Sequence, residues 1–258
     1  MKSFMLGARA LSSSLQNAGN NVHSSAFKNR LLRNLDAATI ERLSLRPINL
    51  EVRREIEFPG KPIDHLFFIE EGVASMTITF MDGSQTEAGL FGYESVMGVS
   101  GLMGTRQSLN RVYMQIAGRG FYSPIAAARR EFQHCSQFQS LTLRYVQSQL
   151  TRSNQSIGCN AKHGIEQRLA KWLLRCADRA GTNTFSISHE FLADMLGSTR
   201  PTVSVVAADL KSMGLIDYSR GTIHILDPKG LESKSCECYR AIKDHLDNNE
   251  EFDSDLAA

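Results

Sequence analysis

The chain lacks long hydrophobic runs and has few cysteines. None of its 258 residues belong to a stretch near the roughly 20 apolar residues of a membrane span, so the sequence predicts no membrane insertion. An odd number of cysteines, spread thinly over a long chain, argues against a disulfide scaffold. The five are Cys135, Cys159, Cys176, Cys236 and Cys238.

Motifs typical of enzymes are also missing. The sequence has no nucleophile elbow, phosphate-binding loop or HExxH helix, and its histidines have no partners that a sequence can show. We therefore predict that the protein is not an enzyme. Hydrophobic residues make up 42% of the chain and charged residues 22%, which is typical of a soluble globular protein. The length suits two ordinary domains or one large one.

The charge is unevenly distributed. Residues 230–258 contain eight acidic and three basic residues, a net charge of −5, which leaves +7 for the rest of the chain. A basic body suits a polyanionic partner, although many soluble proteins are as basic. At the other end, residues 1–24 have no acidic residue, and Arg9 interrupts any secretory hydrophobic segment. We predict a disordered extension over residues 1–26 and a cytoplasmic protein.

Two groups of residues contain side chains of the metal-ligand type. Cys159, His163 and Glu166 lie near one another on a predicted helix, and Cys236 and Cys238 lie in the acidic C-terminal segment. Two or three potential ligands without a fourth, on a helix that also packs a core, are more typical of structure than of metal binding. The sequence therefore predicts no metal and no cofactor.

Residues 50–122 have the pattern of an antiparallel β domain, preceded by a helical stretch over residues 27–45. Short apolar or alternating runs recur between glycines, which predicts a barrel or sandwich. Asp82-Gly83 between two of these runs predicts a two-residue hairpin, because that turn needs positive φ at both positions.

A long helix follows, and its hydrophobic residues form two stripes. Phe138, Leu141 and Tyr145 can pack on the β domain. The other stripe recurs at alternating spacings of three and four, which is typical of a helix that pairs with a second copy. The alternative is a helix that packs only on its own domain; we favour a homodimer. The members of the pairing stripe are Leu143, Val146, Leu150, Ser153 and Ile157.

Residues 185–227 have the pattern of two short helices, a tight turn and a β-hairpin. Ser188 can cap the first helix, and Gly197 lets the backbone reverse. Ser198 or Thr199 can cap the second helix, and Pro201 suits its first turn.

The second helix has an apolar inner face, formed by Val203, Ala207 and Leu210. Strands over residues 215–218 and 222–226 flank a turn at 219–221. This is a winged helix-turn-helix, which places one helix end in the DNA major groove.

The run FLADMLGSTRPTVS, followed by LKSMGLI and YSRGTIHILD, resembles the C-terminal domain of the Crp/Fnr transcription regulators, the cyclic-AMP receptor protein family. The turn glycine, the arginine soon after it and Thr-Val within the helix all match, and a looser likeness extends back to about residue 28. It implies an α+β fold: an N-terminal antiparallel β-roll of the cyclic-nucleotide-binding kind, a long dimerisation helix and a C-terminal winged helix-turn-helix.

The resemblance also sets the expected domains and partners. Double-stranded DNA and a second copy of the chain are expected partners, and RNA polymerase is implied by the family. The alternative is a scaffold or sensor that does not bind DNA. Such a protein would be expected to have a neutral or acidic surface at the start of the second helix. Arg200 and the nearby hydroxyls argue against this alternative. We expect a disordered extension over 1–26, the β-roll over 27–132, the dimerisation helix over 133–160, the winged helix-turn-helix over 161–229 and an acidic tail over 230–258.

The expected DNA contacts divide by role. Hydroxyls and helix N-termini hold phosphates, and Ser188, Thr199 and Thr202 are placed for this. Arg200 matches the family's base-reading arginine and can donate two hydrogen bonds to guanine O6 and N7, with a phosphate contact as its alternative role. The cyclic-AMP receptor has a glutamate and a further arginine where this chain has Pro201 and Val205, so the operator is expected to differ. The remaining candidates are Ser204, for a base or a phosphate, and Arg220.

The effector site departs from the family pattern. Members that bind cyclic nucleotides carry a Gly-Glu pair and, farther along, Arg-Ser or Arg-Thr. Here Gly98 is followed by Val99, and Leu109-Asn110 stands near the Arg-Ser position. We predict no cyclic-nucleotide effector, since Arg106 and Arg111 could reach a ligand only after remodelling of the loop; a degenerate pocket and another ligand stay open. The N-terminal cysteine cluster of Fnr-type iron–sulfur sensors has no counterpart before Cys135.

Overall fold

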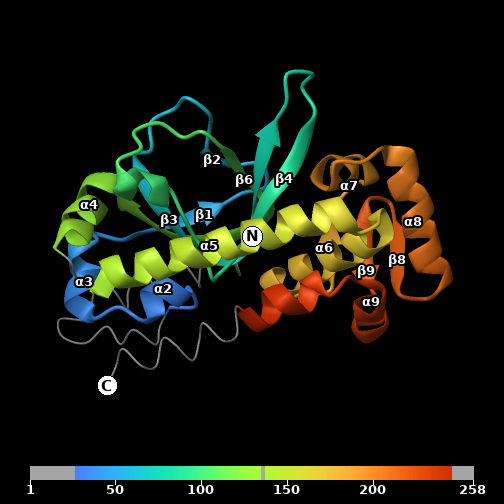
Figure 1. Ribbon diagram of the computed structural model, residues 1–258. Helices are drawn as coiled ribbons and strands as arrows, with labels where there is room; N and C mark the ends of the chain where they lie inside the picture. The colour runs from blue at the N-terminus through green and yellow to red at the C-terminus, as the bar shows by residue number, and fades with distance from the viewer. Residues whose placement is uncertain (1–26, 135–136, 246–258) are drawn as a thin grey trace.

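The computed structural model describes residues 27–134 and 137–245 (Figure 1). The expected N-terminal extension, Cys135 and the end of the expected acidic tail lie outside the described residues. Within the described part of the chain, no helix is both long and apolar enough to cross a membrane.

Two short helices, α2 (Arg30–Arg33) and α3 (Ala37–Arg42), replace the single helical stretch expected over 27–45. The helical stretch is divided in two because it contains a second N-cap residue. Asn29 accepts hydrogen bonds from the backbone of α2, and Asp36 does the same for α3. Leu32 and Leu35, within this segment, are buried.

The antiparallel sheet expected between residues 50 and 122 is present. Its strands follow the order β1-β6-β3-β4, with β2 paired to β6 and β5 paired to β3. A short 3₁₀ helix, η2 (Val99–Met103), follows β5. The strands are β1 (Arg46–Leu50), β2 (Glu55–Glu57), β3 (His65–Thr79), β4 (Gln85–Phe91), β5 (Val96–Met97) and β6 (Arg111–Pro124).

The hairpin between β3 and β4 differs from the one expected. The Phe80 N–H donates to the Ser84 carbonyl, so three residues, 81–83, form the loop. Only Gly83 has positive φ, at 82°, while Asp82 accepts hydrogen bonds from the backbone and side chain of Ser84. A turn that closes with one left-handed residue suits this sequence, because only Gly83 adopts that conformation without strain.

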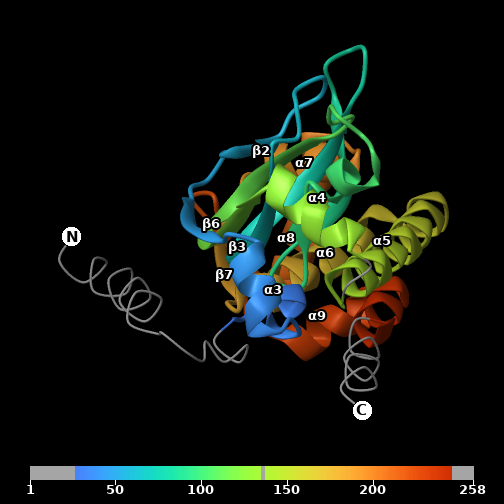
Figure 2. The same ribbon diagram turned by 90° about the vertical axis from the view of Figure 1, so that its left-hand side faces the viewer.

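Two helices connect the sheet to the C-terminal half. α4 (Ile125–Gln133) is followed by α5 (Gln137–Lys162), which runs along most of the molecule (Figure 1). Phe138, Leu141 and Tyr145 are buried against the sheet and the N-terminal helices, as predicted. Figure 2 shows α5 lying to one side of the sheet.

The C-terminal half is a winged helix-turn-helix, as predicted. It adds a strand that the sequence analysis did not identify, β7, which pairs with β9. Three strands therefore form the wing sheet, in the order β7-β9-β8. The elements are α6 (Ile165–Ala180), β7 (Thr184–Ser186), α7 (His189–Leu196), α8 (Arg200–Ser212), β8 (Ile216–Ser219), β9 (Thr222–Ile225) and α9 (Pro228–Lys234).

The two halves share one hydrophobic core. Val73 and Leu90, on β3 and β4, lie in the same buried cluster as Leu169 and Leu173 on α6. The indole N–H of Trp172 donates to the Glu87 carboxylate on β4 at 3.2 Å. The helix-turn-helix is therefore packed on the sheet.

The described part of the expected acidic tail, residues 230–245, is packed rather than extended. Residues 238–245 are helical after α9, and Leu231, Tyr239 and Ile242 are buried. The hydroxyl of Tyr239 donates to Asp178 on α6 at 2.9 Å. Net acidity suggested a solvated tail, but buried apolar residues at helical spacing hold this part of the segment against α6.

Candidate nucleic-acid interface

The turn between α7 and α8 forms as the sequence predicts. The Ser188 hydroxyl caps α7 by accepting from the Phe191 N–H at 3.1 Å. Gly197 ends α7 with φ of 56°, a conformation that residues with a Cβ rarely adopt. The Thr199 hydroxyl caps α8 by accepting from the Thr202 N–H at 3.4 Å.

The helix α8 buries one side and exposes the other. Val203, Ala207 and Leu210 are buried in the core shared with α6 and α7. The first turns of the opposite side are exposed, where Arg200, Pro201, Thr202 and Val205 lie. Because the N-terminus of a helix carries partial positive charge, this exposed end favours an anionic partner.

Arg200 is an exposed charge with one weak partner at this end. Its side chain is 69% exposed, and its Nε lies 3.9 Å from Glu190 Oε2, an equally exposed carboxylate. Exposed pairs of this kind are worth about 0–1 kcal/mol. Arg200 can therefore leave Glu190 for another acceptor with little loss of stability.

Ser204 is less accessible than the sequence analysis expected. Its hydroxyl hydrogen-bonds His189 Nδ1 at 2.9 Å, and the His189 ring stacks on Tyr218 of β8 at 4.1 Å between centroids. Burial and the nearby Arg200 charge lower the pKa of His189, which favours a neutral ring. His189 and Tyr218 thus connect the start of α7, α8 and the wing. No local sequence pattern points to this connection.

The wing ends in a tight turn. Arg220 and Gly221 both have positive φ, 50° and 79°, between the paired residues Ser219 and Thr222. This two-residue hairpin exposes Arg220 at the tip of the wing.

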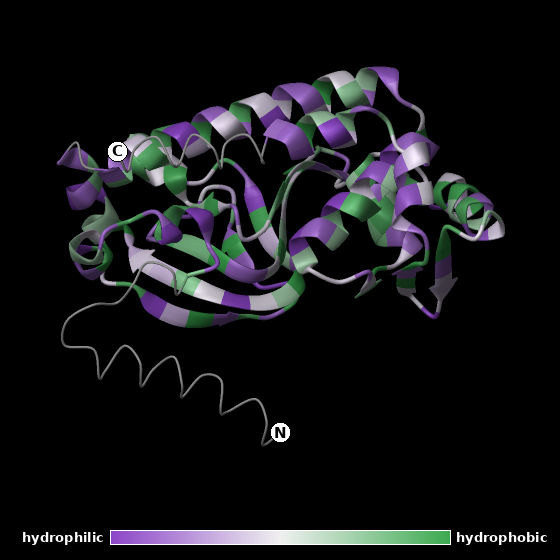
Figure 3. Ribbon diagram, turned by 90° about the horizontal axis from the view of Figure 1, so that it is seen from below, coloured by the Kyte–Doolittle hydropathy of each residue, from purple (hydrophilic) through white to green (hydrophobic). Residues whose placement is uncertain are grey.

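Three of the five residues of the expected pairing stripe of α5 face outward. The exposed fractions of Leu143, Leu150 and Ile157 are 49%, 55% and 68%, while Val146 and Ser153 are half-buried. Figure 3 shows α5 along one edge of the molecule, with hydrophobic residues among the hydrophilic ones over its whole length. Phe138, Leu141 and Tyr145 are buried on the other side of the same helix, so α5 has two apolar sides.

The part of the β-roll that would form the effector site is occupied by a carboxylate of the protein itself. Glu57 accepts from the Gly98 N–H at 2.8 Å and from the buried Ser108 hydroxyl at 2.7 Å. Arg111 is paired with Glu55, with the closest N–O distance at 2.6 Å. The Gly98 N–H, the Ser108 hydroxyl and the Arg111 guanidinium are therefore all bonded to carboxylates.

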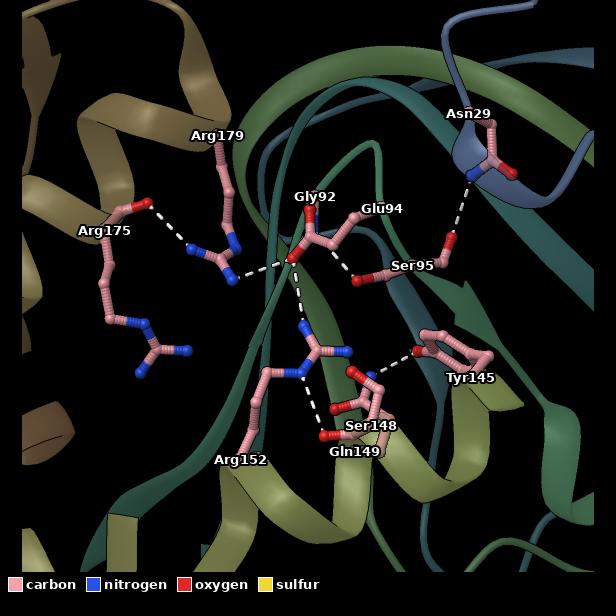
Figure 4. Close-up of polar contacts among 10 residues, drawn as sticks. All are labelled: Asn29, Gly92, Glu94, Ser95, Tyr145, Ser148, Gln149, Arg152, Arg175 and Arg179. Atoms are coloured by element: carbon pink, nitrogen blue, oxygen red, sulfur yellow. Dashed lines mark hydrogen bonds and ion pairs between the residues drawn. The ribbon is translucent and has the colours of Figure 1, made fainter. Parts of the chain in front are cut away.

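A buried ion cluster joins the sheet to α5 and α6 (Figure 4). Glu94, on the loop after β4, pairs with Arg179 at 2.8 Å and with Arg152 at 3.2 Å, and all three side chains are about 4% exposed. Burial raises the pKa of Glu94, but the two guanidinium groups outweigh it and hold that pKa below its ordinary value. Asn29 donates to the Ser95 carbonyl at 2.9 Å and ties the start of α2 to the same loop.

Arg175 lies beside this cluster, and burial together with the Arg179 charge lowers its pKa to about 10. Sequence analysis missed the whole cluster, because its members are far apart in the chain and belong to no recognisable motif.

The two groups of potential metal ligands, which are separate in the sequence, meet in the structure. Cys159 and His163 lie together with Cys236 and Cys238, which the sequence placed in a separate segment. Glu166 is not among these four. The packing of residues 236–238 against the end of α5 and the link to α6 brings the two groups together.

Comparison with known proteins gives one matching family model. Residues 167–234 match the model of the Crp-like helix-turn-helix domain. This range contains the turn, the exposed end of α8 and the wing described above.

Relatives and solved structures extend the likeness over most of the chain. A global nitrogen regulator from Nostoc is 26% identical over 192 residues, which covers 70% of this chain and 85% of that protein. A CRP-like cAMP-activated global transcriptional regulator from Mycobacterium tuberculosis is 23% identical and covers 74% and 88%. These relatives are transcription regulators and not enzymes.

Two solved structures show the same fold at low sequence identity. A CRP-family transcriptional regulator from Thermus thermophilus is 22% identical with a TM-score of 0.60, over 74% of this chain and 96% of that one. FixK2 from Bradyrhizobium japonicum is 15% identical with a TM-score of 0.63, over 74% and 98%.

Proposed function

We propose that the chain is a Crp-like transcription regulator that acts as a homodimer on an inverted-repeat operator, without a cyclic nucleotide as effector; the match of residues 167–234 to the Crp-like helix-turn-helix domain and the likeness to regulators over most of the chain support this. The observation that carries the proposal is the exposed first turn of α8, where Arg200 lies beside a helix N-terminus. The protein would act in the bacterial cytoplasm, with RNA polymerase as a further partner.

The DNA contacts follow from the chemistry of the exposed groups. Arg200 reads a guanine with two hydrogen bonds, and Val205 contacts a thymine methyl beside it. Pro201 and Ser204 lie on the same reading side. The groups that hold phosphates, and thereby set the register without reading bases, are Ser188, Thr199, Thr202 and Arg220.

The proposed dimer pairs the outward stripe of α5 with its copy. Leu143, Leu150 and Ile157 are large apolar side chains left exposed by the monomer, and a second α5 would cover them. Two-fold symmetry would then place two α8 helices about 34 Å apart, one turn of DNA. Half-sites at that spacing form an inverted repeat.

The absence of a cyclic-nucleotide effector is supported by Glu57. Its carboxylate bonds the Gly98 N–H and the Ser108 hydroxyl, and its negative charge would repel a cyclic phosphate at this place. Displacing it would break both of these hydrogen bonds.

Selection of bound duplexes from a random pool tests the function. We expect an enriched inverted repeat with half-sites one helical turn apart, and binding that weakens steeply with salt. A preferred site without two-fold symmetry, or binding with no sequence preference, would contradict the proposal.

Isothermal calorimetry tests the effector. We expect no micromolar binding of cyclic AMP or cyclic GMP. Binding that is lost in Arg106→Ala or Arg111→Ala would show that the loop remodels around a nucleotide.

A further inference from the structure

Four side chains from three segments meet at the end of α5. Cys159 lies on the last turns of α5, His163 in the link to α6, and Cys236 and Cys238 lie after α9. Their donor atoms all lie within 4.8 Å of one another. The three cysteines are almost completely buried, with exposed fractions of 3% or less.

The distances fit a single ion held tetrahedrally. Zinc–sulfur bonds of about 2.3 Å give tetrahedron edges of roughly 3.8 Å. Here Cys159 Sγ lies 3.5 Å from Cys236 Sγ, and Cys238 Sγ lies 3.6 Å from His163 Nδ1. Donors this close leave room for one ion at their centre and none for the inorganic sulfides of an iron–sulfur cluster.

The groups around the four donors complete such a site. The Gln155 amide donates to Cys238 Sγ at 3.0 Å, and the Lys171 ammonium donates to Cys159 Sγ at 2.9 Å. Both sulfurs are therefore acceptors, as thiolate ligands are. One divalent ion with three thiolates and a neutral imidazole has a net charge of −1, which the buried Lys171 neutralises.

The histidine is oriented as metal-binding histidines are. Its Nδ1 faces the cysteines, while its Nε2 lies 3.1 Å from Glu237 Oε1. A carboxylate on the outer ring nitrogen fixes the tautomer that leaves the inner nitrogen free to bind a metal.

We propose that Cys159, His163, Cys236 and Cys238 bind one Zn²⁺ ion in a closed Cys₃His site that ties the end of α5 to the segment after the wing. Four protein ligands leave no open position, which is typical of a structural rather than a catalytic zinc. Soft thiolate and imidazole donors in a tetrahedral set select zinc over magnesium or calcium. Binding displaces the thiol protons, so protons are released as the ion enters. The proposal differs from the expectation of no metal, and it does not depend on the DNA-binding proposal.

The test measures metal binding to the whole chain, with its cysteines reduced and without DNA. The protein is stripped with a chelator and titrated with Co²⁺, whose visible absorption reports tetrahedral thiolate coordination, and then with Zn²⁺. We expect one ion per chain, displacement of Co²⁺ by Zn²⁺, and loss of the signal in Cys236→Ser and His163→Ala. Cys176→Ala is the matched control, because Cys176 is a buried cysteine outside the site, and it should bind as the wild type does.

A conservative variant guards against loss of folding. Glu237 is 77% exposed, so Glu237→Gln should fold normally. Removing the carboxylate that orients His163 should weaken Zn²⁺ binding about 10- to 100-fold in competition with a chelator. Unchanged affinity in this variant counts against the proposal.

Three further results would overturn it: no uptake of Co²⁺ or Zn²⁺ by the wild type, wild-type stoichiometry in folded Cys236→Ser, or a metal-free protein purified with a Cys159–Cys236 disulfide.

Discussion

Arg200 sits at the exposed end of α8 with one weak partner, Glu190 at 3.9 Å. If Arg200 reads a guanine, Arg200→Ala should lose about 1–3 kcal/mol of discrimination at one guanine per half-site, the worth of a good bidentate contact. Binding of the variant to the operator and to guanine-substituted duplexes measures this loss. Arg54→Ala removes an equal charge from the exposed link before β2 and should leave discrimination unchanged.

Thr199→Ala and Thr202→Ala should behave differently from Arg200→Ala. Phosphate contacts position the protein without reading bases, so binding should weaken equally for all duplexes. Thr199→Ala also removes the cap of α8, which costs about 0.5–2 kcal/mol of stability. If Arg200→Ala also weakens every duplex equally, Arg200 is a phosphate anchor, and specificity comes from Ser204, Val205 or DNA shape.

Glu94→Gln should strongly destabilise the protein. The variant leaves Arg152 and Arg179 buried with less compensating charge, and breaking a buried pair in this way costs about 3–5 kcal/mol. The pKa of Glu94 is lower in the folded state, so its stabilisation is full above the unfolded value near 4.5 and is lost as pH falls through the folded value. Urea unfolding at neutral and acidic pH measures both. A variant as stable as the wild type at pH 7 would contradict this role.

Single residues could be predicted from the sequence where their function is local. Ser188, Gly197 and Thr199 act on neighbours within a few positions, so capping and turn rules identify them. Glu94 and His189 act on residues brought close only by packing. The two pairs of potential metal ligands, Cys159 with His163 and Cys236 with Cys238, were each visible, but nothing local shows that they meet.

The helix α5 presents an apolar stripe with no cover in the described monomer. Leu150→Asp should convert a dimer into a monomer, because the charge would be buried at the centre of the pairing helices. Thr151→Asp, one residue along on an exposed side of α5, places the same charge off the stripe and should leave the dimer intact. Sedimentation at micromolar concentration, with and without operator, distinguishes the two. A monomeric wild type in both conditions would contradict the proposed dimer.

At the scale of elements, the hydrophobic period predicted the long helices and missed the short elements. The period predicted α5 and the buried side of α8. It merged α2 and α3, because the interrupting cap at Asp36 hardly changes an apolar pattern. It also missed β7, whose three residues are too few to show alternation and are held by pairing with β9.

The whole molecule is expected to unfold as one unit, because Val73 and Leu90 of the sheet share a core with α6. Trp172 is the only tryptophan and lies on α6, so its fluorescence reports the C-terminal half. Leu50 is buried in a different cluster, within the β-roll. Leu50→Ala should therefore lower the stability seen by Trp172 fluorescence by about 2–5 kcal/mol, the usual cost of a buried Leu→Ala change, although Leu50 is outside the reporter's cluster.

Urea titrations followed by Trp172 fluorescence and by far-ultraviolet circular dichroism compare the unfolding of the C-terminal half with that of the whole molecule. All variants are measured at one protein concentration, because dimerisation adds stability. In the wild type the two transitions should coincide. Leu90→Ala removes part of the shared core and is expected to lower the unfolding midpoint seen by both probes. If the contact of Leu90 with α6 couples the two halves, the two midpoints should also differ from each other. Should Leu50→Ala shift circular dichroism while Trp172 fluorescence keeps its wild-type midpoint, the helix-turn-helix folds independently of the sheet. The packing of β4 against α6 and α7 would then contribute too little stability to fix the position of α8.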